Sequence, residues 1–207
     1  MKQGLLIALE GPDGCGKTTQ IQLLDNYFKI KGFDVIKTRE PGGTAISEKI
    51  RNIILDNNNN EMSDMCEALL YAASRAQLTD EVIKPALNSG KMVICDRFVY
   101  SSMVYQGVGR ELGMDAIKSI NEAALRGLEA DIVFMITIPY EQGLERKRNQ
   151  RELDRLENVG DNFHKKVFEG YSKICEIYDK IIVIDGNRSI EEIHREIITH
   201  IEQKIGI

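Results

Sequence analysis

A glycine-rich segment near the start of the chain has the residue types needed to hold a row of phosphates. It matches the pattern G-x-x-x-x-G-K-[ST] in full and reads Gly11-Pro12-Asp13-Gly14-Cys15-Gly16-Lys17-Thr18. Glycines let backbone N–H groups turn inward around phosphate oxygens, and a helix that begins there adds the positive end of its dipole. Lys17 would reach the β- and γ-phosphates, and the Thr18 hydroxyl would coordinate Mg²⁺. We predict that this segment, the phosphate loop, binds a nucleoside triphosphate.

A carboxylate and a guanidinium stand side by side further along the chain. Asp96 and Arg97 directly follow the apolar run Lys91–Cys95. Beside a phosphate loop, a carboxylate at a strand end can hold the water shell of Mg²⁺. The neighbouring arginine can clamp the phosphate of a second ligand with two parallel hydrogen bonds. Without the phosphate loop, the same pair would be interpreted as a plain salt bridge.

Basic residues are concentrated in one short stretch near residue 150. They are Arg146, Lys147, Arg148, Arg151 and Arg155. A charge run of this kind is usually a solvated helix face, and that interpretation stays open. On a chain whose net charge is −5, the stretch is nevertheless a local positive patch that suits a polyanion.

These groups need elements that bring them together, and the hydrophobic pattern predicts such elements. Five short apolar runs, separated by stretches with helical spacing, are Leu5–Leu9, Phe33–Lys37, Lys91–Cys95, Asp131–Thr137 and Lys180–Ile184. Runs without clean alternation are typical of strands buried on both faces, and strands that alternate with helices indicate a parallel sheet. The phosphate loop and Asp96-Arg97 then share the sheet edge at which open α/β folds bind ligands. We predict an α/β protein with a five-stranded parallel sheet and helices on both faces.

Length and composition exclude several other classes of protein. The 207 residues fit one domain, and 43% apolar with 29% charged residues exclude disorder, collagen and a whole-chain coiled coil. No apolar run approaches the ~18–20 residues of a membrane span, and a dedicated duplex-DNA binder would more often be basic. The four cysteines form no CxxC pair, so zinc is not expected. We expect a reduced, cytoplasmic protein with no membrane or nucleic-acid partner.

Together with the phosphate loop, four further segments closely resemble the thymidylate kinase family. They are Thr38-Arg39-Glu40-Pro41-Gly42-Gly43-Thr44, Leu69-Leu70-Tyr71-Ala72-Ala73-Ser74-Arg75, Asp96-Arg97-Phe98 and Ser101-Ser102-Met103-Val104-Tyr105-Gln106-Gly107. One such segment would be weak evidence, but five in the family's order are strong evidence. The resemblance also continues through the basic stretch to Leu153-Asp154-Arg155-Leu156-Glu157, so it covers nearly the whole chain. The resemblance implies a P-loop nucleoside monophosphate kinase fold over residues 1–207, with a lid at about 143–157. It also implies phosphoryl transfer from ATP·Mg²⁺ to dTMP, forming ADP and dTDP.

The resemblance assigns the acceptor side of the site. It places Asp13 near the sugar hydroxyl and phosphate of dTMP, and makes Arg39 a second ligand of the phosphate region beside Arg97. It puts the Glu40-Pro41 turn at the substrate pocket, where Pro41 is a candidate for a cis peptide bond. The plainer interpretations are turn residues for Arg39 and Glu40 and solvent exposure on the loop tip for Asp13.

The base and sugar of dTMP are assigned in the same way. The resemblance has Arg75 and Ser102 facing the thymine base and Gln106 beside the base or sugar. It lays Tyr105 against the deoxyribose, where a 2′-hydroxyl would not fit. A snorkelling arginine at 75 and a core tyrosine at 105 are the alternatives.

The donor side follows from the same resemblance. The phosphate loop carries no basic residue besides Lys17, so a lid arginine would neutralise the transferring phosphoryl group. Arg151 is the first choice, with Arg146 and Arg148 behind it, because Arg151 sits at the predicted turn. The loop after the fifth run, with Asn187, would face the adenine, and Ser189 would cap the last helix. The full set expected on ATP is Gly11, Pro12, Asp13, Gly14, Cys15, Gly16, Lys17, Thr18, Thr19, Arg146, Arg148 and Asn187, and the catalytic set is Lys17, Asp96, Arg97, Arg151 and Asp13.

Two other functions stay open at this stage. A deoxynucleoside kinase also carries an acid and an arginine after its third strand, with the acid as base for a 5′-hydroxyl. A nucleotide-dependent switch protein would hydrolyse ATP slowly without any acceptor. The family is homodimeric, which implies a second copy as partner. The apolar stretch Met62–Ala73 would suit a two-fold interface, although a core role explains it equally well.

Overall fold

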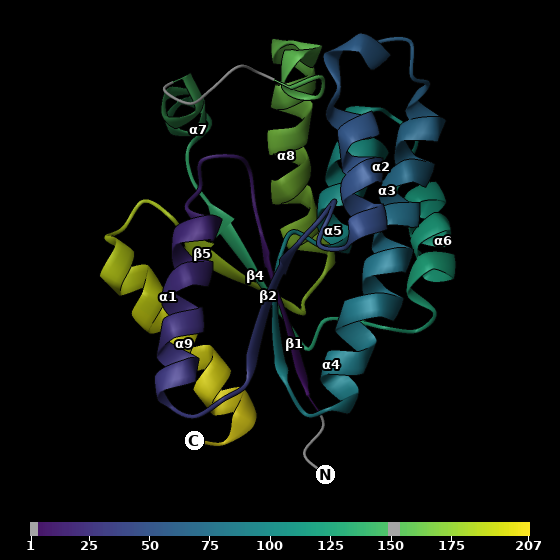
Figure 1. Cartoon of the computed structure of the whole chain (residues 1–207). Helices are drawn as coiled ribbons and strands as arrows, with labels where there is room; N and C mark the ends of the chain where they lie inside the picture. The colour runs from purple at the N-terminus through teal and green to yellow at the C-terminus, as the bar shows by residue number, and fades with distance from the viewer. Residues whose placement is uncertain (1–3, 149–153) are drawn as a thin grey trace.

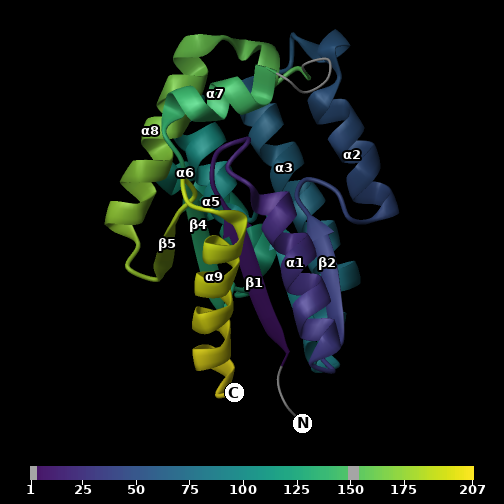
Figure 2. The same cartoon turned by 90° about the vertical axis from the view of Figure 1, so that its left-hand side faces the viewer.

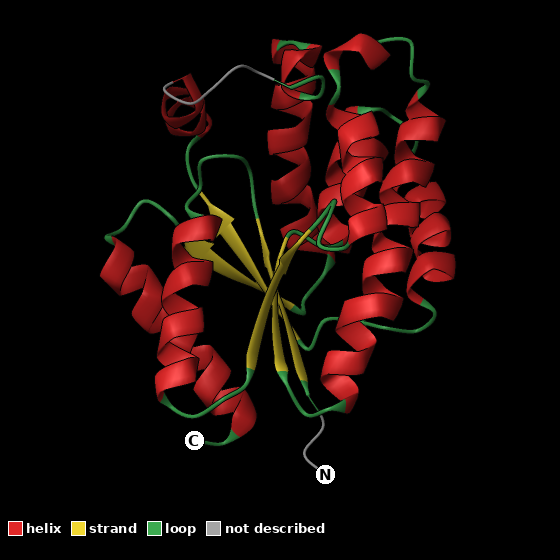
Figure 3. Cartoon of the chain, in the orientation of Figure 1, coloured by secondary structure: helices red, strands yellow, loops and turns green. Residues whose placement is uncertain are grey.

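Five parallel strands form the single sheet of the protein. The computed structural model describes residues 4–148 and 154–207. The strands are β1 (Leu5–Glu10), β2 (Val35–Arg39), β3 (Met92–Asp96), β4 (Ile132–Thr137) and β5 (Ile181–Asp185), in the order β2-β3-β1-β4-β5. Figure 1 and Figure 3 show the strands fanning out between two groups of helices. The predicted α/β class and the five-stranded parallel sheet are confirmed.

The register brings the chemical groups to one edge of the sheet. Arg39 of β2 and Leu9 of β1 both pair with Asp96 at the end of β3. The phosphate loop therefore leaves β1 beside the Asp96-Arg97 pair. The second strand runs two residues later than predicted, because beyond the end of the preceding helix at Ile30 the chain is still held to that helix by Phe33. Its N–H donates to the carbonyl of Phe28 over 2.9 Å, and the two rings pack edge to face.

Two helices cover one face of the sheet. These are α1 (Lys17–Ile30) and α9 (Ile190–Ile205), which lie together on the left of Figure 1 and at the front of Figure 2. The apolar faces of both helices are buried against the strands. The shared core contains Ile21, Leu24 and Phe28 of α1, Ile193, Ile197 and Ile201 of α9, and Ile7 and Leu9 of β1.

More helices cover the opposite face. They are α3 (Asp64–Leu78), α4 (Lys84–Asn88), α5 (Val99–Ser102), α6 (Met114–Leu125) and α8 (Asp161–Ile177), with α2 (Ala45–Leu55) packed on α3. Leu6 and Ala8 of β1 belong to this second core, whereas Ile7 and Leu9 belong to the first. Both faces of the strand are therefore buried, which is why its sequence shows no alternation.

Several shorter elements shape the end of the molecule where the site lies. The helix α7 (Tyr140–Arg148) lies beyond the carboxyl ends of the strands (Figure 2). Two π-helical turns, η2 (Thr79–Ile83) and η3 (Met103–Gly109), extend α3 and α5, and 3₁₀ turns occupy Asn57–Asn59 and Glu157–Val159. The wide turn η3 turns the neighbouring side chains of Tyr105 and Gln106 toward one cavity. Within the described residues, no helix is long and apolar enough to cross a membrane.

Candidate active site

The phosphate loop connects β1 to α1 and has the backbone its glycines require. Gly11 has a φ of 135°, and a side chain there would collide with the carbonyl of Ile136 in β4. Gly16 has a φ of 99° and caps α1, so Lys17 is the first residue of the helix. The Lys17 ammonium is 7% exposed and donates to the carbonyls of Gly11 and Pro12, both over 2.9 Å. The loop thus holds the Lys17 side chain in place where Lys17 lines a groove.

That groove has a volume of about 1020 Å³ and is lined mainly by polar residues. Its lining includes Asp13, Gly14, Cys15, Gly16, Lys17, Thr18, Thr19, Asp96, Arg146 and Arg188. The Thr18 hydroxyl donates to an Asp96 carboxylate oxygen over 3.4 Å, so the predicted magnesium ligands lie together. Among the described residues, no three carboxylate, histidine or cysteine side chains gather as a metal cage. Two hard oxygens beside a phosphate site suit Mg²⁺, which keeps most of its waters and takes phosphate oxygens as further ligands.

A second, smaller cavity of about 190 Å³ lies next to the groove. Residues expected on the acceptor side line it: Asp13, Pro41, Arg75, Arg97, Ser102, Tyr105 and Gln106. Five side chains line both spaces: Asp13, Arg51, Arg97, Asp154 and Glu157. Two ligands that filled the two spaces would meet at these groups.

Arg97 lies at the junction of the two spaces. Its φ is 66°, a left-handed conformation that is costly for a residue with a side chain and that tends to occur at functional sites. The guanidinium donates to the Gly11 carbonyl and the Ser101 hydroxyl, both over 3.0 Å, and forms an ion pair with Asp13. The Tyr105 hydroxyl donates to the same Asp13 carboxylate over 3.2 Å. Asp13 therefore has partners within the site although its side chain is 39% exposed, and Tyr105 is at once buried and part of the cavity.

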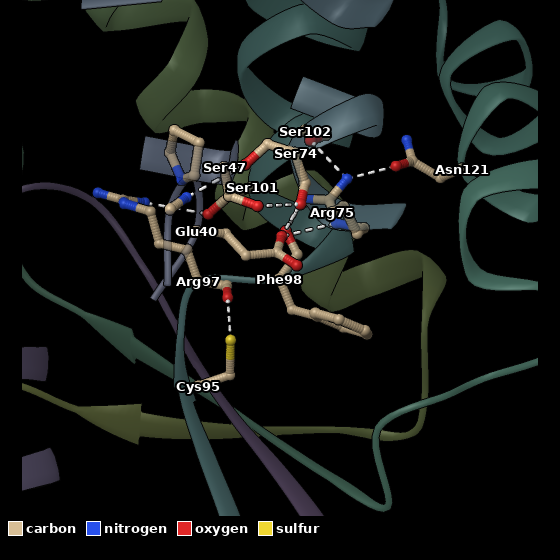
Figure 4. Close-up of polar contacts among 12 residues, drawn as sticks. Glu40, Ser47, Ser74, Arg75, Cys95, Arg97, Phe98, Ser101, Ser102 and Asn121 are labelled. Carbon is tan, nitrogen blue, oxygen red and sulfur yellow. Dashed lines mark hydrogen bonds and ion pairs between the residues drawn. The ribbon is translucent and has the colours of Figure 1, made fainter. Parts of the chain in front are cut away.

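Arg75 is buried rather than snorkelling at the surface. It is 1% exposed and lies at the centre of the network drawn in Figure 4. Its Nε donates to Glu40 over 2.6 Å. Its Nη1 donates to Ser102 over 3.0 Å and also to Asn121. Its Nη2 donates to the Phe98 carbonyl over 3.0 Å and forms an ion pair with Glu40. All five N–H donors of the guanidinium thus have partners. Burial raises the pKa of Glu40 to about 7, against the opposing pull of Arg75.

A buried glutamate that the sequence reasoning missed holds this part of the site in place. Glu10, at the end of β1, is fully buried and accepts hydrogen bonds from the backbone N–H groups of Phe98 and Ser101 over 2.9 and 3.2 Å. It also accepts a hydrogen bond from the Ser101 hydroxyl over 2.5 Å. These bonds fix the turn that carries Arg97 and starts α5. A charged residue ending an otherwise apolar strand was the available signal.

Two arginines near the end of β2 differ in their position relative to the two spaces. Arg39 lines neither space; it forms a bidentate pair with Glu48 over 2.9 and 3.0 Å and remains half exposed. Arg51 of α2, which the sequence reasoning missed, lines both spaces and donates to the Pro41 carbonyl over 2.9 Å. Ser47 and Ile54, four residues before and three residues after Arg51, are buried on the same face of the helix, so an arginine on that buried face was the available signal. The peptide bond before Pro41 is cis, as anticipated.

The basic stretch divides into parts with different surroundings. Arg146 on α7 donates to the Gly14 carbonyl over 3.0 Å and lines the groove. Arg151 and the side chain of Arg148 lie outside the described residues. Arg155 corrects the expectation of a uniform positive surface, because it is 5% exposed and pairs with the buried Glu67 over 2.6 Å. Its side chain belongs to the interior.

The loop after β5 agrees with the sequence in part. Ser189 caps α9 in a reciprocal pair with Glu192, as predicted. Asn187 does not line the groove and accepts a hydrogen bond from Gln142 over 2.7 Å, whereas Gly186 and Arg188 do line it. The loop therefore reaches the groove through the neighbours of Asn187.

Comparison with known proteins gives a consistent result. The family model described as thymidylate kinase matches residues 9–197. The thymidylate kinase of Finegoldia magna is 47% identical over 97% of this chain and 98% of its own length. That of Fervidobacterium nodosum is 48% identical over 94% and 96%, and that of Geobacillus sp. strain WCH70 is 47% identical over 98% of both chains.

Proposed function

The chain belongs to the thymidylate kinase family, and from that premise we propose how its residues carry the family's reaction, the ATP-dependent phosphorylation of dTMP to dTDP. The observation that carries the proposal is the meeting of two spaces at Arg97 and Asp13. The groove would take ATP, with its triphosphate on the phosphate loop. The smaller cavity would take dTMP, with its phosphate toward the shared side chains.

On the donor side, Lys17 and the inward N–H groups of the loop would hold the β- and γ-phosphates. Thr18 and Asp96 would hold Mg²⁺, which neutralises phosphate charge when bound. Arg146 already reaches the loop and would add positive charge over the triphosphate. Arg151 stays our first choice for the lid arginine at the transferring group.

On the acceptor side, Arg97 would clamp the dTMP phosphate, and Arg51 is better placed than Arg39 to assist it. Asp13 and Tyr105 would face the deoxyribose, where the ring of Tyr105 leaves no space for a 2′-hydroxyl. Gln106 would meet the base edge.

Arg75 would act on the base together with Ser102. All five donors of its guanidinium have protein partners, so a base carbonyl would share the Nη1 donors. The Ser102 hydroxyl accepts from Arg75, and its own proton is then available for the base. This supports Ser102 as the direct contact and Arg75 as the group that polarises it.

The reaction needs positioning more than a base. The acceptor is a phosphate whose second pKa is about 6, so it is mainly dianionic at neutral pH and already nucleophilic. Catalysis then rests on aligning two polyanions and screening their repulsion, for which Lys17, Arg97 and the lid arginines are suited. Closure of the lid would exclude water and suppress hydrolysis of ATP.

A coupled assay of ADP release tests the proposed function. With ATP·Mg²⁺, we expect turnover with dTMP and none with thymidine. Turnover with thymidine alone would favour the deoxynucleoside kinase, and acceptor-independent hydrolysis would favour a switch protein. Omission of Mg²⁺ should abolish turnover with dTMP.

We also propose that the chain forms a homodimer. The support is the set of exposed large apolar side chains on α2 and α3, which are Ile46, Ile53, Met65 and Leu69. Apolar groups left on the surface of two neighbouring helices are candidates for an interface. The expectation of a cytoplasmic location stays a prediction.

A further inference from the structure

A fully buried glutamate on α3 is the centre of a network behind the acceptor cavity. Glu67 accepts hydrogen bonds from the Gln106 amide over 2.9 Å, from Arg110 over 3.2 and 2.9 Å, and from Arg155 over 2.6 Å. The three donors come from η3, from the turn that follows it and from the segment after the lid. Glu67 itself does not line the cavity, so it can act only through these neighbours.

The two arginines determine the protonation state of Glu67. Burial favours the neutral acid, but hydrogen bonds from Arg110, Gln106 and Arg155 outweigh it and hold the pKa of Glu67 below its ordinary value. An ionised carboxylate can only accept hydrogen bonds. The end of the Gln106 amide that faces Glu67 must therefore be its NH₂ group.

The other end of the Gln106 amide is consequently fixed as an acceptor. Gln106 is 1% exposed and lines the acceptor cavity, and its Oε1 is buried with no hydrogen-bond partner among the described residues. A buried acceptor without a partner is costly unless a ligand supplies a donor. If the amide were reversed, the same position would present a donor instead.

We propose that Glu67 is a specificity-determining positioning residue, which fixes the Gln106 amide so that the base cavity presents an acceptor to an N–H donor of the incoming base. This inference rests on the proposed function. Thymine offers one such donor, its ring imide N–H, whereas the corresponding ring nitrogen of cytosine is an acceptor. Glu67 thus selects the hydrogen-bonding pattern of the base through Gln106, without contacting the base itself.

A double-mutant cycle tests the proposal through the KM for dTMP. In Glu67→Gln the residue at 67 can donate or accept, so Gln106 loses its fixed orientation. We expect the KM for dTMP to rise at least about tenfold, with kcat within about threefold of the wild type, and the preference for dTMP over dCMP to fall. In the Gln106→Leu background, which has no amide to orient, Glu67→Gln should change the KM by less than about twofold. An equal effect in both backgrounds would mean a general structural role and would overturn the proposal.

Two further variants keep the test decisive. Asp64→Asn alters an exposed partner of Arg110 in the same network but leaves the contact between Glu67 and Gln106, so the KM for dTMP should not change. If Glu67→Gln does not fold, Glu67→Asp retains the charge between the arginines and withdraws the carboxylate from Gln106. It should raise the KM in the native background only, and an unchanged KM would refute the inference. Failure of the wild type to phosphorylate dTMP would instead refute the proposed function.

Discussion

Arg51 places a positive charge at the junction of the two spaces. It lies on α2, which contains none of the sequence motifs. Replacing it with alanine removes a charged hydrogen-bond donor from the dTMP phosphate, so kcat/KM for dTMP should fall by roughly 10- to 100-fold. Arg39→Ala is the matched control, because Arg39 pairs with Glu48 outside both spaces. We expect less than about a threefold effect there. Steady-state kinetics that show the larger loss in Arg39→Ala would restore the original assignment.

Glu40 makes a prediction about pH, because its folded pKa lies above its ordinary value of 4.5, at about 7. Between these two values the folded chain holds the Glu40 proton more tightly than the unfolded chain does. The contribution of Glu40 to stability is therefore complete below pH 4.5 and is lost as the pH rises to about 7 and above. The loss is on the order of 3 kcal/mol at most.

Urea denaturation at several pH values between 5 and 8.5 measures this contribution. The free energy of unfolding should decline more steeply with pH in the wild type than in Glu40→Gln, which has no proton to release. Parallel pH profiles for the two proteins would show that Glu40 does not titrate in this range.

Sequence patterns located those site residues that belong to a motif. The phosphate-loop pattern and the strand ends correctly located Lys17, Thr18 and Asp96 at the groove. Arg97 lines both the groove and the smaller cavity. Glu10 and Glu67 were missed because they contact no predicted ligand. They hold backbone groups and side chains that do line the site, and such supporting roles leave no fixed spacing in the sequence.

At the scale of elements, Arg155 holds the segment after the lid to α2 and α3. Arg155 donates through Nε to the Ile54 carbonyl over 2.6 Å and through its backbone N–H to the Leu55 carbonyl over 3.1 Å, besides its pair with Glu67. Its charge therefore serves packing, although it lies in the stretch whose composition suggested a surface.

Arg155→Met tests this role. The variant leaves part of a buried carboxylate and a carbonyl without donors, so the free energy of unfolding should fall by about 2 kcal/mol or more. Arg126→Met breaks an exposed pair with Asp80 and should cost at most about 1 kcal/mol. Urea denaturation compares the two, and equal small losses would mean that the Arg155 contacts contribute little.

The regular elements were largely predictable, and the irregular ones were not. Apolar runs predicted all five strands, because burial of both faces of the sheet controls that pattern. The boundaries of β2 shifted because the contacts with Phe28 hold Phe33 against the end of α1. The π-helical turn at Met103–Gly109 has no simple periodic signal, yet it directs both Tyr105 and Gln106 into the cavity.

At the scale of the whole molecule, the dimer is the prediction that follows from the exposed face of α2 and α3. Light scattering after size exclusion should give twice the chain mass for the wild type, and Leu69→Glu should give a monomer because a buried unpaired charge is costly. Ile177→Glu places the same charge on an exposed apolar site of α8 and should remain dimeric. A monomeric wild type, or a dimeric Leu69→Glu, would exclude this interface.

Across the whole molecule, the proposed function has two anionic ligands meet at one junction of a chain whose net charge is negative. The most direct test is phosphorus NMR of the products formed from ATP·Mg²⁺ with equal amounts of dTMP and thymidine. We predict dTDP and ADP in equal amounts, with thymidine unconsumed and no excess inorganic phosphate. Formation of new dTMP from thymidine, or of ADP and phosphate without dTDP, would contradict the account.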